Sequence, residues 1–506
     1  MRVRIVPAAV GIAFLGIIGG TQSADPNINA TALLRAAKSL DLGNLTPLAA
    51  SIASLVLAGT VIATGTVADR VGRKKVLSAG LVAVAAGDVL VILASGSAMF
   101  MLGRVIVGLG MGAVFGSVFA YVKHFATGKG GLLAAVGILM AAGFLTNVIV
   151  TFVGGLLAGI DWRVAYMLIP VVSLIVLVVG QFIVPGDDTA ERLKGGWDLP
   201  GQAMMSLGII ALLVGVAHIS AGLGSPLTWV PLVAGAVLLI GFVIWERHRA
   251  ERAFFPAALF RSPIFIAAIL IGLTCHLAYG AGLLSFTSLF QITVGLRGSA
   301  LALAQLPFLL AGIVTAFVFT KVRGDSGRRG RGAMVIGTIT TALGFAALAV
   351  PAWGGSDSYW SYVAGTILIG AGAMLASIPF GSMILESADA THLGPVSASR
   401  FSIGQFWMAL GLAGSTVIID GLARHDVQTQ LGTRAAVDFE TWAVSGGRVP
   451  EPARVLDVAG AVYPGAFAWA MIIVAVLVGA AGAAAVTVVA RWDRTQAASG
   501  ATGSEA

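Results

Sequence analysis

The feature that most constrains this chain is the repetition of apolar stretches about 20 residues long along most of its 506 residues. A helix that rises 1.5 Å per residue needs about 20 residues to cross the ~30 Å hydrocarbon core of a bilayer. Only 11% of the residues are charged, against roughly 25% in an ordinary soluble domain. The pattern excludes a soluble enzyme and predicts an all-α integral membrane protein.

Fourteen such stretches predict fourteen transmembrane helices, grouped as six, two and six. Polar, charged segments separate the groups, so we expect two six-helix bundles related as pseudo-twofold halves. The predicted spans are Ile5–Leu33, Leu48–Val67, Val76–Ala94, Met99–Val122, Leu132–Leu157, Val164–Ile183, Gly201–Gly222, Val230–Trp245, Ile264–Phe290, Leu301–Thr320, Ala333–Val350, Tyr362–Met383, Ser397–Ile419 and Ala466–Val489. The predicted domains are a first bundle at 1–183, a linker with two extra helices at 184–262, a second bundle at 263–492 and a disordered cytoplasmic tail at 493–506.

The positive charges are distributed as in a membrane protein. A formal net charge of +8 would suggest a nucleic-acid partner in a soluble chain. Here Lys and Arg gather in alternate connections between the spans, which is the bias that cytoplasmic loops show. We therefore expect a multi-pass protein of the inner (plasma) membrane with both termini in the cytoplasm. Its surroundings are the lipid bilayer, and no nucleic-acid partner is expected.

The amino terminus also resembles a secretory signal peptide, because Arg2 and Arg4 precede an apolar run that ends in small and polar residues. A cleaved signal ends in an A-x-A-like site, and Gln22 is a poor residue three positions before the candidate cut. The run also leads directly into residues that make sense inside a span. Retention as the first span is the preferred interpretation.

A charged loop joins the second and third predicted spans. Gly72 allows a tight turn of the backbone. Asp69 can accept hydrogen bonds from Arg73 or from the amino end of a neighbouring helix. Such contacts can hold two bundles together and break when the bundles rock. The loop reads Gly65-Thr66-Val67-Ala68-Asp69-Arg70-Val71-Gly72-Arg73-Lys74-Lys75.

An echo of this loop follows the tenth predicted span and reads Asp325-Ser326-Gly327-Arg328-Arg329. A repeat at equivalent positions supports a duplicated six-span unit with a substrate site between the halves. We expect the two loops to control conformational exchange. The residues assigned to this conformational lock are Gly65, Asp69, Arg70, Gly72, Arg73, Asp325 and Arg328.

The first loop is similar to the G-x-x-x-D-R-x-G-R-K/R-K/R signature of the major facilitator superfamily, which lies between spans 2 and 3 in that family. The fourteen-span plan resembles its drug/proton antiporter branch. The resemblance covers nearly the whole chain. It implies the major facilitator fold, a proton gradient as energy source, no cofactor and a monomer. Other stretches that look like this branch are Trp197-Asp198-Leu199-Pro200-Gly201, Leu259-Phe260-Arg261-Ser262-Pro263-Ile264-Phe265, Gln305-Leu306-Pro307-Phe308 and Gly394-Pro395-Val396-Ser397-Ala398.

Arg104 is the leading ionisable residue within a predicted span. A charge in lipid costs roughly 2.5–3.5 kcal/mol on insertion scales, so such residues indicate function by default. The stretch from Gly103 to Gly110 matches the R-x-x-x-G-x-G pattern that the family associates with proton coupling. The alternative is that Arg104, about one turn into the span, extends to the outer interface. Asp88, in the third span, either pairs with Arg104 or lies near a wet interface.

Asp25 is the second candidate for proton coupling, at the acidic position that the antiporter branch carries in its first span. Its neighbours form the most polar segment of any predicted span, and Pro26 frees backbone carbonyls that polar groups or water can satisfy. A carboxylate in such a partly dry site can bind a proton near neutral pH. The alternative is that the span ends at Ala24 and that Asp25 caps an external helix.

Polar and aromatic residues of the second bundle are weak candidates for a substrate cavity. The histidines lack metal-ligand spacing, so no metal site is expected. Arg400 is expected near the cytoplasmic surface, with a lipid headgroup as its partner in preference to substrate. The cavity candidates are His276, Gln305, Gln405 and Trp407.

The fifth span departs from the antiporter branch. Gly154 and Gly155 match the end of that branch's G-P-x-x-G-G element, but Val150 and Thr151 stand at the Gly-Pro positions. Without proline the helix keeps a backbone hydrogen bond and is expected to bend less. The departure weakens the case for strict drug/proton exchange but not the case for transport.

Three functions remain open. The first is proton-coupled export of amphipathic drugs or other hydrophobic small molecules, and the second is dedicated export of one endogenous metabolite or lipid. The third is a membrane-embedded enzyme or sensor, which would need a cluster of reactive side chains at one membrane depth. The chain has no phosphate-binding G-x-x-x-x-G-K-[ST] motif, which argues against an ATP-driven pump.

Overall fold

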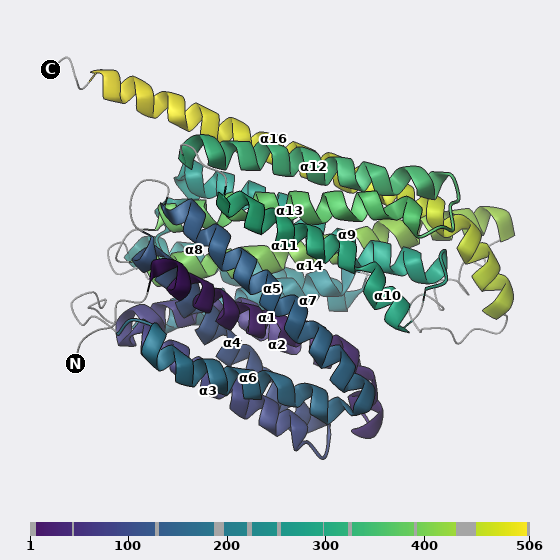
Figure 1. The fold of residues 1–506 in the computed structure, drawn as a ribbon, viewed down its shortest axis with the longest axis horizontal. Helices are drawn as coiled ribbons and strands as arrows, with labels where there is room; N and C mark the ends of the chain where they lie inside the picture. Colours follow the sequence, from purple (N-terminus) through teal and green to yellow (C-terminus); the bar gives the residue numbers. More distant parts are fainter. Residues whose placement is uncertain are drawn as a thin grey trace.

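The computed structural model is a bundle of long helices that run roughly along one direction, with no strand among the residues it describes (Figure 1). This confirms the all-α fold class. The described residues are 7–42, 45–126, 131–186, 197–219, 225–249, 255–296, 298–321, 326–388, 392–431 and 452–502.

Within these residues, 12 helices are long and apolar enough to cross a membrane. The long α1 and the shorter apolar helix α11 fall outside that set, so the fourteen-span count stays a prediction. The helices are α1 (Ala8–Ser39), α2 (Thr46–Val71), α3 (Arg73–Ile92), α4 (Ser97–Phe125), α5 (Gly131–Ile160), α6 (Trp162–Ile183), α7 (Leu199–Ala217), α8 (Pro226–Arg249), the 3-10 helix η4 (Ala257–Arg261), α9 (Pro263–Ile292), α10 (Gly298–Ala304), α11 (Leu306–Lys321), α12 (Ser326–Trp353), α13 (Trp360–Ser387), α14 (Leu393–Leu431) and α16 (Pro452–Thr502).

Two helices differ from the predicted spans. The tenth span is broken at Gln305 into α10 and α11, and the nearby Pro307 has no backbone N–H to continue the helical ladder. The last helix, α16, is 51 residues long and runs on to Thr502. The helix therefore continues past the predicted end of the last span at Val489, and the tail expected to be disordered from residue 493 is helical up to Thr502.

Local sequence explains several helix ends. Gly72 joins α2 to α3 with a φ of 124°, a region that favours glycine. Asp161 caps α6 by accepting from the Arg163 N–H at 2.7 Å. Asp198 caps α7 by accepting from the Gly201 N–H at 3.2 Å. Both carboxylates satisfy donors that a helix start leaves unpaired. The first helix of the extra pair, α7, thus begins at a capping residue of its own.

The two bundles repeat one packing plan. In the first bundle α1 packs on α5, α3 packs on α4, and α2 lies against α4. In the second bundle α9 packs on α14, α12 packs on α13, and α11 lies against α13. The extra helices α7 and α8 pack on each other, and α7 also contacts α2 and α14 (Figure 1). The repeat agrees with the predicted pseudo-twofold halves.

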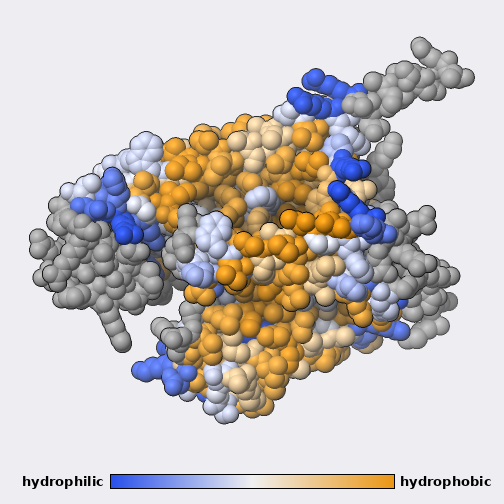
Figure 2. Space-filling view, turned by 180° about the vertical axis from the view of Figure 1, so that it is seen from behind, coloured by the Kyte–Doolittle hydropathy of each residue, from blue (hydrophilic) through white to orange (hydrophobic). Residues whose placement is uncertain are grey.

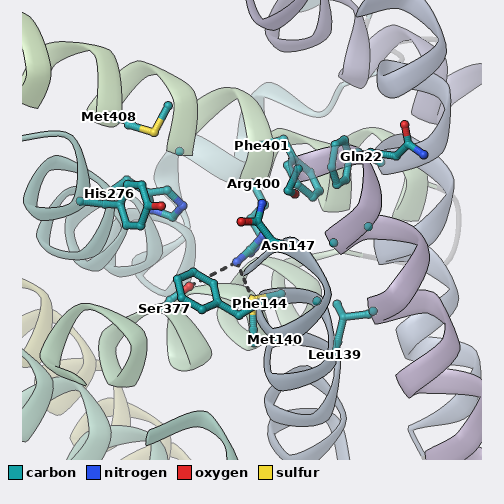
Figure 3. Close-up of a pocket in the computed structure, with 18 of the residues that line it drawn as sticks. Gln22, Leu139, Met140, Phe144, Asn147, His276, Ser377, Arg400, Phe401 and Met408 are labelled. Carbon is teal, nitrogen blue, oxygen red and sulfur yellow. Dashed lines mark hydrogen bonds between the residues drawn. The ribbon is translucent and has the colours of Figure 1, made fainter. Parts of the chain in front are cut away.

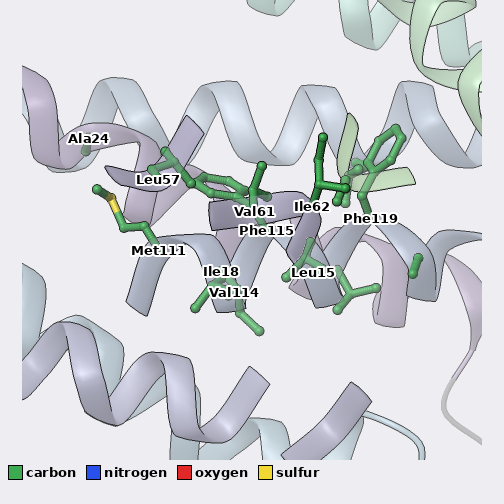
Figure 4. Close-up of a cluster of buried hydrophobic side chains, with 14 of the residues drawn as sticks. Leu15, Ile18, Ala24, Leu57, Val61, Ile62, Met111, Val114, Phe115 and Phe119 are labelled. Carbon is green, nitrogen blue, oxygen red and sulfur yellow. The ribbon is translucent and has the colours of Figure 1, made fainter. Parts of the chain in front are cut away.

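The outer surface is apolar along the middle of the helices and polar towards their ends (Figure 2). Large side chains on this belt are open to the surroundings, such as Val237 with 62% and Val314 with 59% of its area exposed. α1 begins and α16 ends at the same end of the bundle, which we call the terminal face (Figure 1). Apolar side chains of α1, α2 and α4 fill the interior of the first bundle, and Figure 4 draws Leu15, Ile62 and Phe115 among them.

Candidate functional site

A cavity of about 320 Å³ lies between the two bundles, at the lower end of the range for small-molecule pockets. Helices α1, α2, α4 and α5 line it from the first bundle, and α9, α11, α13 and α14 line it from the second. Aromatic rings, methionines and glycines make up most of the wall (Figure 3). The described residues that line it include no Asp or Glu.

Two of the four predicted cavity residues line this space. His276 and Gln405 are in its wall. Gln305 and Trp407 are not among the described lining residues of this cavity, so their assignment stays a prediction. Gln305 lies at the break between α10 and α11 and donates to Thr287 Oγ1 at 3.1 Å, so it is held within its own bundle.

Arg400 also lines the cavity, where the sequence predicts a headgroup contact at the surface. The side chain is 6% exposed and extends from α14 toward α5 and α13. Its Nη2 donates to Ser377 Oγ at 3.3 Å and lies 3.1 Å from Met140 Sδ (Figure 3). The prediction is wrong because α14 begins at Leu393, which places Arg400 two turns inside the helix.

A second polar centre is buried inside the first bundle. Arg104 of α4 donates two parallel hydrogen bonds to Asp25 of α1, Nη1 to Oδ1 at 2.8 Å and Nη2 to Oδ2 at 2.7 Å. Both side chains are 1% exposed. α1 continues past Asp25 to Ser39, so Asp25 does not cap an external helix, and Arg104 does not reach an interface. This bidentate geometry is the strongest form of an ion pair.

Asp88 of α3 completes this cluster. Its Oδ1 lies 3.9 Å from Arg104 Nη1, and neither oxygen has a hydrogen-bond partner. Two ionised carboxylates and one guanidinium would leave a net negative charge in an interior that is 1% exposed. Burial of a net charge is costly, so the cluster is best satisfied when it also holds one proton.

Tyr166 of α6 supports the cluster, and the sequence does not single it out. Its ring lies 5.7 Å from the Arg104 guanidinium carbon, and its hydroxyl donates to Asn29 Oδ1. Asn29 in turn donates to the Ala49 and Ala50 carbonyls of α2 at 3.3 and 3.0 Å. An aromatic residue in a span is by default a packing group, so only the fold identifies this role.

The ion pair and the cavity meet on α1. Gln22, Pro26 and Asn27 line the cavity, whereas Asp25 is turned to Arg104 on another side of the helix. A shift or rotation of α1 would therefore change the ion pair and the cavity wall together.

The predicted lock loop joins the bundles at the terminal face. Asp69 is 6% exposed and accepts from Arg73 Nε at 3.0 Å and from the Gly394 backbone N–H at 2.6 Å. Gly394 is the second residue of α14, so Asp69 meets the positive end of a helix of the second bundle. Gly65 allows this approach, because a Cβ there would lie 2.7 Å from the Gly394 carbonyl oxygen.

Lys123 provides a matching contact that the sequence does not predict. Its ammonium donates to the Ala388 carbonyl at 2.7 Å and to the Leu385 carbonyl at 3.4 Å, at the carboxyl end of α13. A cation at that end is favoured by the helix dipole. A carboxylate and an ammonium group of the first bundle thus contact the amino end of α14 and the carboxyl end of α13 in the second.

Three other predicted lock residues differ in what the structure describes. The Arg70 guanidinium lies 5.2 Å from the centre of the Trp197 ring, next to α7. Asp325 lies outside the described residues, and Arg328 lies in α12 with its side chain outside them. The echo loop therefore stays a prediction.

At the departure in the fifth span, Thr151 has a contact that a proline could not make. Its Oγ1 accepts from Asn27 Nδ2 at 3.2 Å, which ties α5 to the polar segment of α1. α5 runs without interruption from Gly131 to Ile160. The missing proline is thus accompanied by a side-chain hydrogen bond between the two helices.

Comparison with known proteins gives one family over most of the chain. Residues 10–412 match the model described as "Major Facilitator Superfamily". An MFS-type transporter of Mycobacterium tuberculosis, strain H37Rv, named as uncharacterized, is 26% identical over 427 residues, or 82% of this chain. The chain spans 58% of the length of that relative.

Two further relatives carry functional names. The "Probable actinorhodin transporter" of Streptomyces coelicolor is 24% identical over 80% of this chain and 71% of the relative. The "Putative multidrug resistance protein MdtD" of Salmonella paratyphi A is 27% identical over 85% of this chain and 92% of the relative.

Solved structures share the fold. The proton:xylose symporter XylE, bound to 6-bromo-6-deoxy-D-glucose, has a TM-score of 0.59 and 13% identity, with 93% of this chain and 94% of that chain covered. The human organic anion transporter MFSD10 has a TM-score of 0.58 and 14% identity, with 94% and 100% covered. At these identities the likeness shows the arrangement of helices alone.

Proposed function

This chain belongs to the major facilitator superfamily of membrane transporters, and we propose that it exports amphipathic or hydrophobic small molecules in exchange for protons. Family membership identifies a transporter and not an enzyme. The names of the multidrug resistance and actinorhodin relatives support export of small organic molecules. The location is a bacterial inner membrane, with the terminal face in the cytoplasm.

The buried Asp25–Arg104 pair, on the helix that lines the cavity, is the observation that carries proton coupling. Protonation of Asp25 would remove the charge that holds Arg104 and weaken both hydrogen bonds. α1 would then be free to shift, and the cavity wall at Gln22 and Asn27 would shift with it. Substrate and proton can therefore exclude each other without occupying the same site.

Asp88 gives the cluster somewhere to keep a proton between steps. It lies within 3.9 Å of Arg104 and has no hydrogen-bond partner, so it would hold the proton while Asp25 stays paired. Exchange of Arg104 between the two carboxylates would pass the proton from one to the other. The proton site in this proposal is the cluster of three side chains.

The Asp69 and Lys123 contacts would act as the conformational lock. Both join the two bundles at the terminal face, so both must break before the cavity can open to the cytoplasm. In alternating access one set of gate contacts breaks while the opposite set forms. In this proposal the structure represents a state that is closed to the cytoplasm.

Dedicated export of one endogenous metabolite is the second candidate. The cavity of about 320 Å³ is small, and Arg400 is a single strong anchoring group, which favours a narrow substrate range. The fold is the same for both candidates, and only the number of accepted substrates separates them.

The test is transport by purified protein in proteoliposomes, with a panel of fluorescent amphipathic dyes and a clamped pH gradient. We expect the dye to move in the direction opposite to the flow of protons. This movement should stop when an ionophore collapses the gradient, and it should be absent from protein-free vesicles. Dye movement that ignores the gradient would contradict proton coupling. Movement of only one compound in the panel would favour the dedicated exporter.

A further inference from the structure

We propose that the cavity takes its substrate as an anion and that Arg400 binds the anionic group, a carboxylate, sulfonate or phosphate. The inference rests on the proposed export function, because it names the substrate class of the same cavity. It departs from the sequence prediction of a lipid headgroup contact at the surface.

Arg400 is a buried cation without a described carboxylate or phosphate partner. It is 6% exposed, and its hydrogen-bond partners, Ser377 Oγ and Met140 Sδ, are neutral and weak acceptors. Its Nε has no hydrogen-bond partner at all. A guanidinium has five N–H donors in a fixed plane, so most of its capacity is free for a ligand.

The surroundings of Arg400 stabilise its charge but do not neutralise it. The guanidinium carbon lies 4.8 Å from the Phe119 ring centre and 5.4 Å from the centres of Phe380 and Phe401. Aromatic faces attract a cation and accept few of its N–H bonds. Gly381 also keeps the space near Nε open, because a Cβ there would lie 3.3 Å from that atom.

The charged residues that line the cavity indicate which charge a substrate should carry. None of the described lining residues is an Asp or Glu, and Asp25 is committed to Arg104 on another side of α1. A cationic substrate would meet Arg400 without a compensating acid. An anionic substrate would supply the charge that the site lacks, and the low-dielectric wall would strengthen that contact.

The rest of the wall sets the body of the substrate. Phe115, Phe144, Tyr279 and Phe308 present aromatic groups, and the polar lining groups are few. At about 320 Å³ the space suits a molecule of two or three rings. The geometry therefore points to a weak organic acid with an aromatic or apolar body.

A purely structural role for Arg400 makes a different prediction. Its contacts span the bundles, with Met140 and Phe119 from the first and Ser377 and Phe380 from the second. If those contacts were its only role, loss of the charge would weaken every ligand equally or unfold the protein. If it is an anion receptor, the loss falls on anions alone.

The experiment compares two probes that share one aromatic body. 8-Anilinonaphthalene-1-sulfonate carries the anion, and N-phenyl-1-naphthylamine is the same skeleton without it. Binding to full-length protein in phosphatidylcholine nanodiscs is measured by fluorescence, with empty nanodiscs subtracted. The variants are Arg400→Gln and Arg400→Lys, and the matched control is Arg331→Gln, a surface arginine with 45% of its side chain exposed.

We expect Arg400→Gln to weaken sulfonate binding by about 10- to 100-fold, the value of a charge-assisted hydrogen bond, and to leave the neutral probe within about threefold. Arg400→Lys keeps the charge without the planar fork, so its sulfonate affinity should lie between wild type and Arg400→Gln. Arg331→Gln should match wild type for both probes.

Equal loss of both probes in Arg400→Gln, or no loss of the sulfonate probe, would overturn the proposal. If Arg400→Gln fails to fold, the wild-type preference decides: weaker binding of the sulfonate than of the neutral probe overturns it. Gradient-driven transport is measured separately, so a wild type that binds the sulfonate through Arg400 but does not transport it refutes export and leaves the anion site standing. Displacement of the probe by short-chain phosphatidylglycerol and not by phosphatidylcholine would identify the bound anion as a lipid headgroup, whereas no displacement indicates a soluble acid.

Discussion

The two bundles share a set of glycine contacts that fixes how their helices meet. In the first bundle a Cβ on Gly87 would lie 2.8 Å from the Gly103 carbonyl oxygen, so α3 and α4 touch backbone to backbone. In the second bundle a Cβ on Gly344 would lie 3.0 Å from the Gly365 carbonyl oxygen, where α12 meets α13. Matching contacts let residues of the two bundles be compared position by position.

At the compared positions the first bundle has charged residues and the second bundle has neutral ones. Asp88 follows Gly87, and Phe345 follows Gly344. Arg104 follows Gly103, and Thr366 follows Gly365. Phe345 and Thr366 are both fully buried, and the Thr366 hydroxyl donates to a carbonyl of its own helix. The helix packing is thus compatible with an uncharged interior, and the charges of the first bundle are not needed to build it.

The position equivalent to Asp25, the third member of the cluster, is also neutral in the second bundle. A Cβ on Gly20 would meet the Gly143 carbonyl oxygen, and a Cβ on Gly280 would meet the Met408 carbonyl oxygen. Five residues after each glycine stand Asp25 and Ser285. Ser285 donates to Ser415 Oγ at 3.1 Å, a neutral hydrogen bond.

The second bundle has its own buried charge at a different place. Arg400 lies eight residues before Met408, and the residue eight before Gly143 in the first bundle is Ala135. The first bundle therefore holds the buried Asp25–Arg104–Asp88 cluster, which is the proposed proton site, and the second holds the cation that faces the cavity. Charges that are absent from one of two matched helix packings are best explained by function.

The largest expected effect comes from moving the charge of the first bundle into the second. Thr366→Arg would bury a guanidinium where Ser285 and Phe345 offer no carboxylate. An uncompensated buried charge costs about 3–5 kcal/mol, so we expect the variant to fail to accumulate in the membrane. The measurement is membrane abundance and the unfolding temperature of purified protein, with Thr366→Val as the size-matched control. Wild-type accumulation of Thr366→Arg would mean that the two sites are not equivalent.

The next largest effect separates Asp25 from Ser285. Asp25→Asn removes the charge that Arg104 pairs with, so gradient-driven transport should fall by at least ~100-fold, about 2.7 kcal/mol, while downhill exchange persists. Substrate-induced proton release, followed with a pH dye, should vanish. Ser285→Ala loses one neutral hydrogen bond and should keep both activities.

Persistence of proton release in Asp25→Asn would move the proton site to Asp88, which is then the carboxylate to substitute. Arg104→Ala is expected to impair gradient-driven transport and downhill exchange alike, because it leaves both carboxylates unpaired. Equal losses in Asp25→Asn and Ser285→Ala would remove the division of roles between the bundles.

A third test asks whether the glycine contacts are energetically alike. Gly87→Ala and Gly344→Ala each place a Cβ within 2.8 Å of a neighbouring helix. We expect each to destabilise the protein by ~1–3 kcal/mol, the usual cost of overpacking. The control is Gly155→Ala, because nothing lies within 4 Å of a Cβ there. Thermal unfolding of purified variants measures the effect, and a loss in only one bundle would show that the halves are not packed alike.

The sequence predicts much of this arrangement where a charged residue stands inside an apolar run, because the cost of burying that charge in lipid can be recognised without knowing the fold. Charged residues inside apolar runs identify Asp25, Arg104 and Asp88, and the Gly65–Lys75 loop identifies Asp69. Their partners are harder, because pairs such as Asp25 and Arg104 are 79 residues apart and only helix packing brings them together.

What the sequence misses depends on helix starts and on rotation about the helix axis. Arg400 is misplaced because α14 begins at Leu393, four residues before the predicted span, which buries a residue expected at the surface. Trp407 lies two residues after Gln405 on α14, yet only Gln405 is among the described lining residues of the cavity. In the sequence Lys123 is one of many cations near the end of a span, and only the fold shows that the end of α13 lies beside it. Periodicity alone does not fix such orientations in helices that are apolar on every side.

The smallest effect concerns the lock between the bundles. Asp69→Ala removes an acceptor for the Gly394 N–H and for Arg73, but the loop lies at the terminal face and the helices keep their apolar packing. Membrane abundance should stay near wild type. Turnover should fall by roughly tenfold, which is ~1.4 kcal/mol in the barrier between conformations. Initial rates in proteoliposomes, normalised to inserted protein, measure it.

The companion variant for this prediction is Lys123→Met, which breaks the second contact between the bundles, at the end of α13, and keeps the length of the side chain. If the two contacts form one gate, each variant should slow or uncouple turnover, and the double variant should lose less than the product of the two effects, because a gate already open cannot be opened again. Independent, multiplicative losses would assign the contacts to separate steps. Loss of Asp69→Ala from the membrane together with its activity would instead show that Asp69 is needed for folding, because the positive end of α14 would then be left buried beside Gly65 without an acceptor.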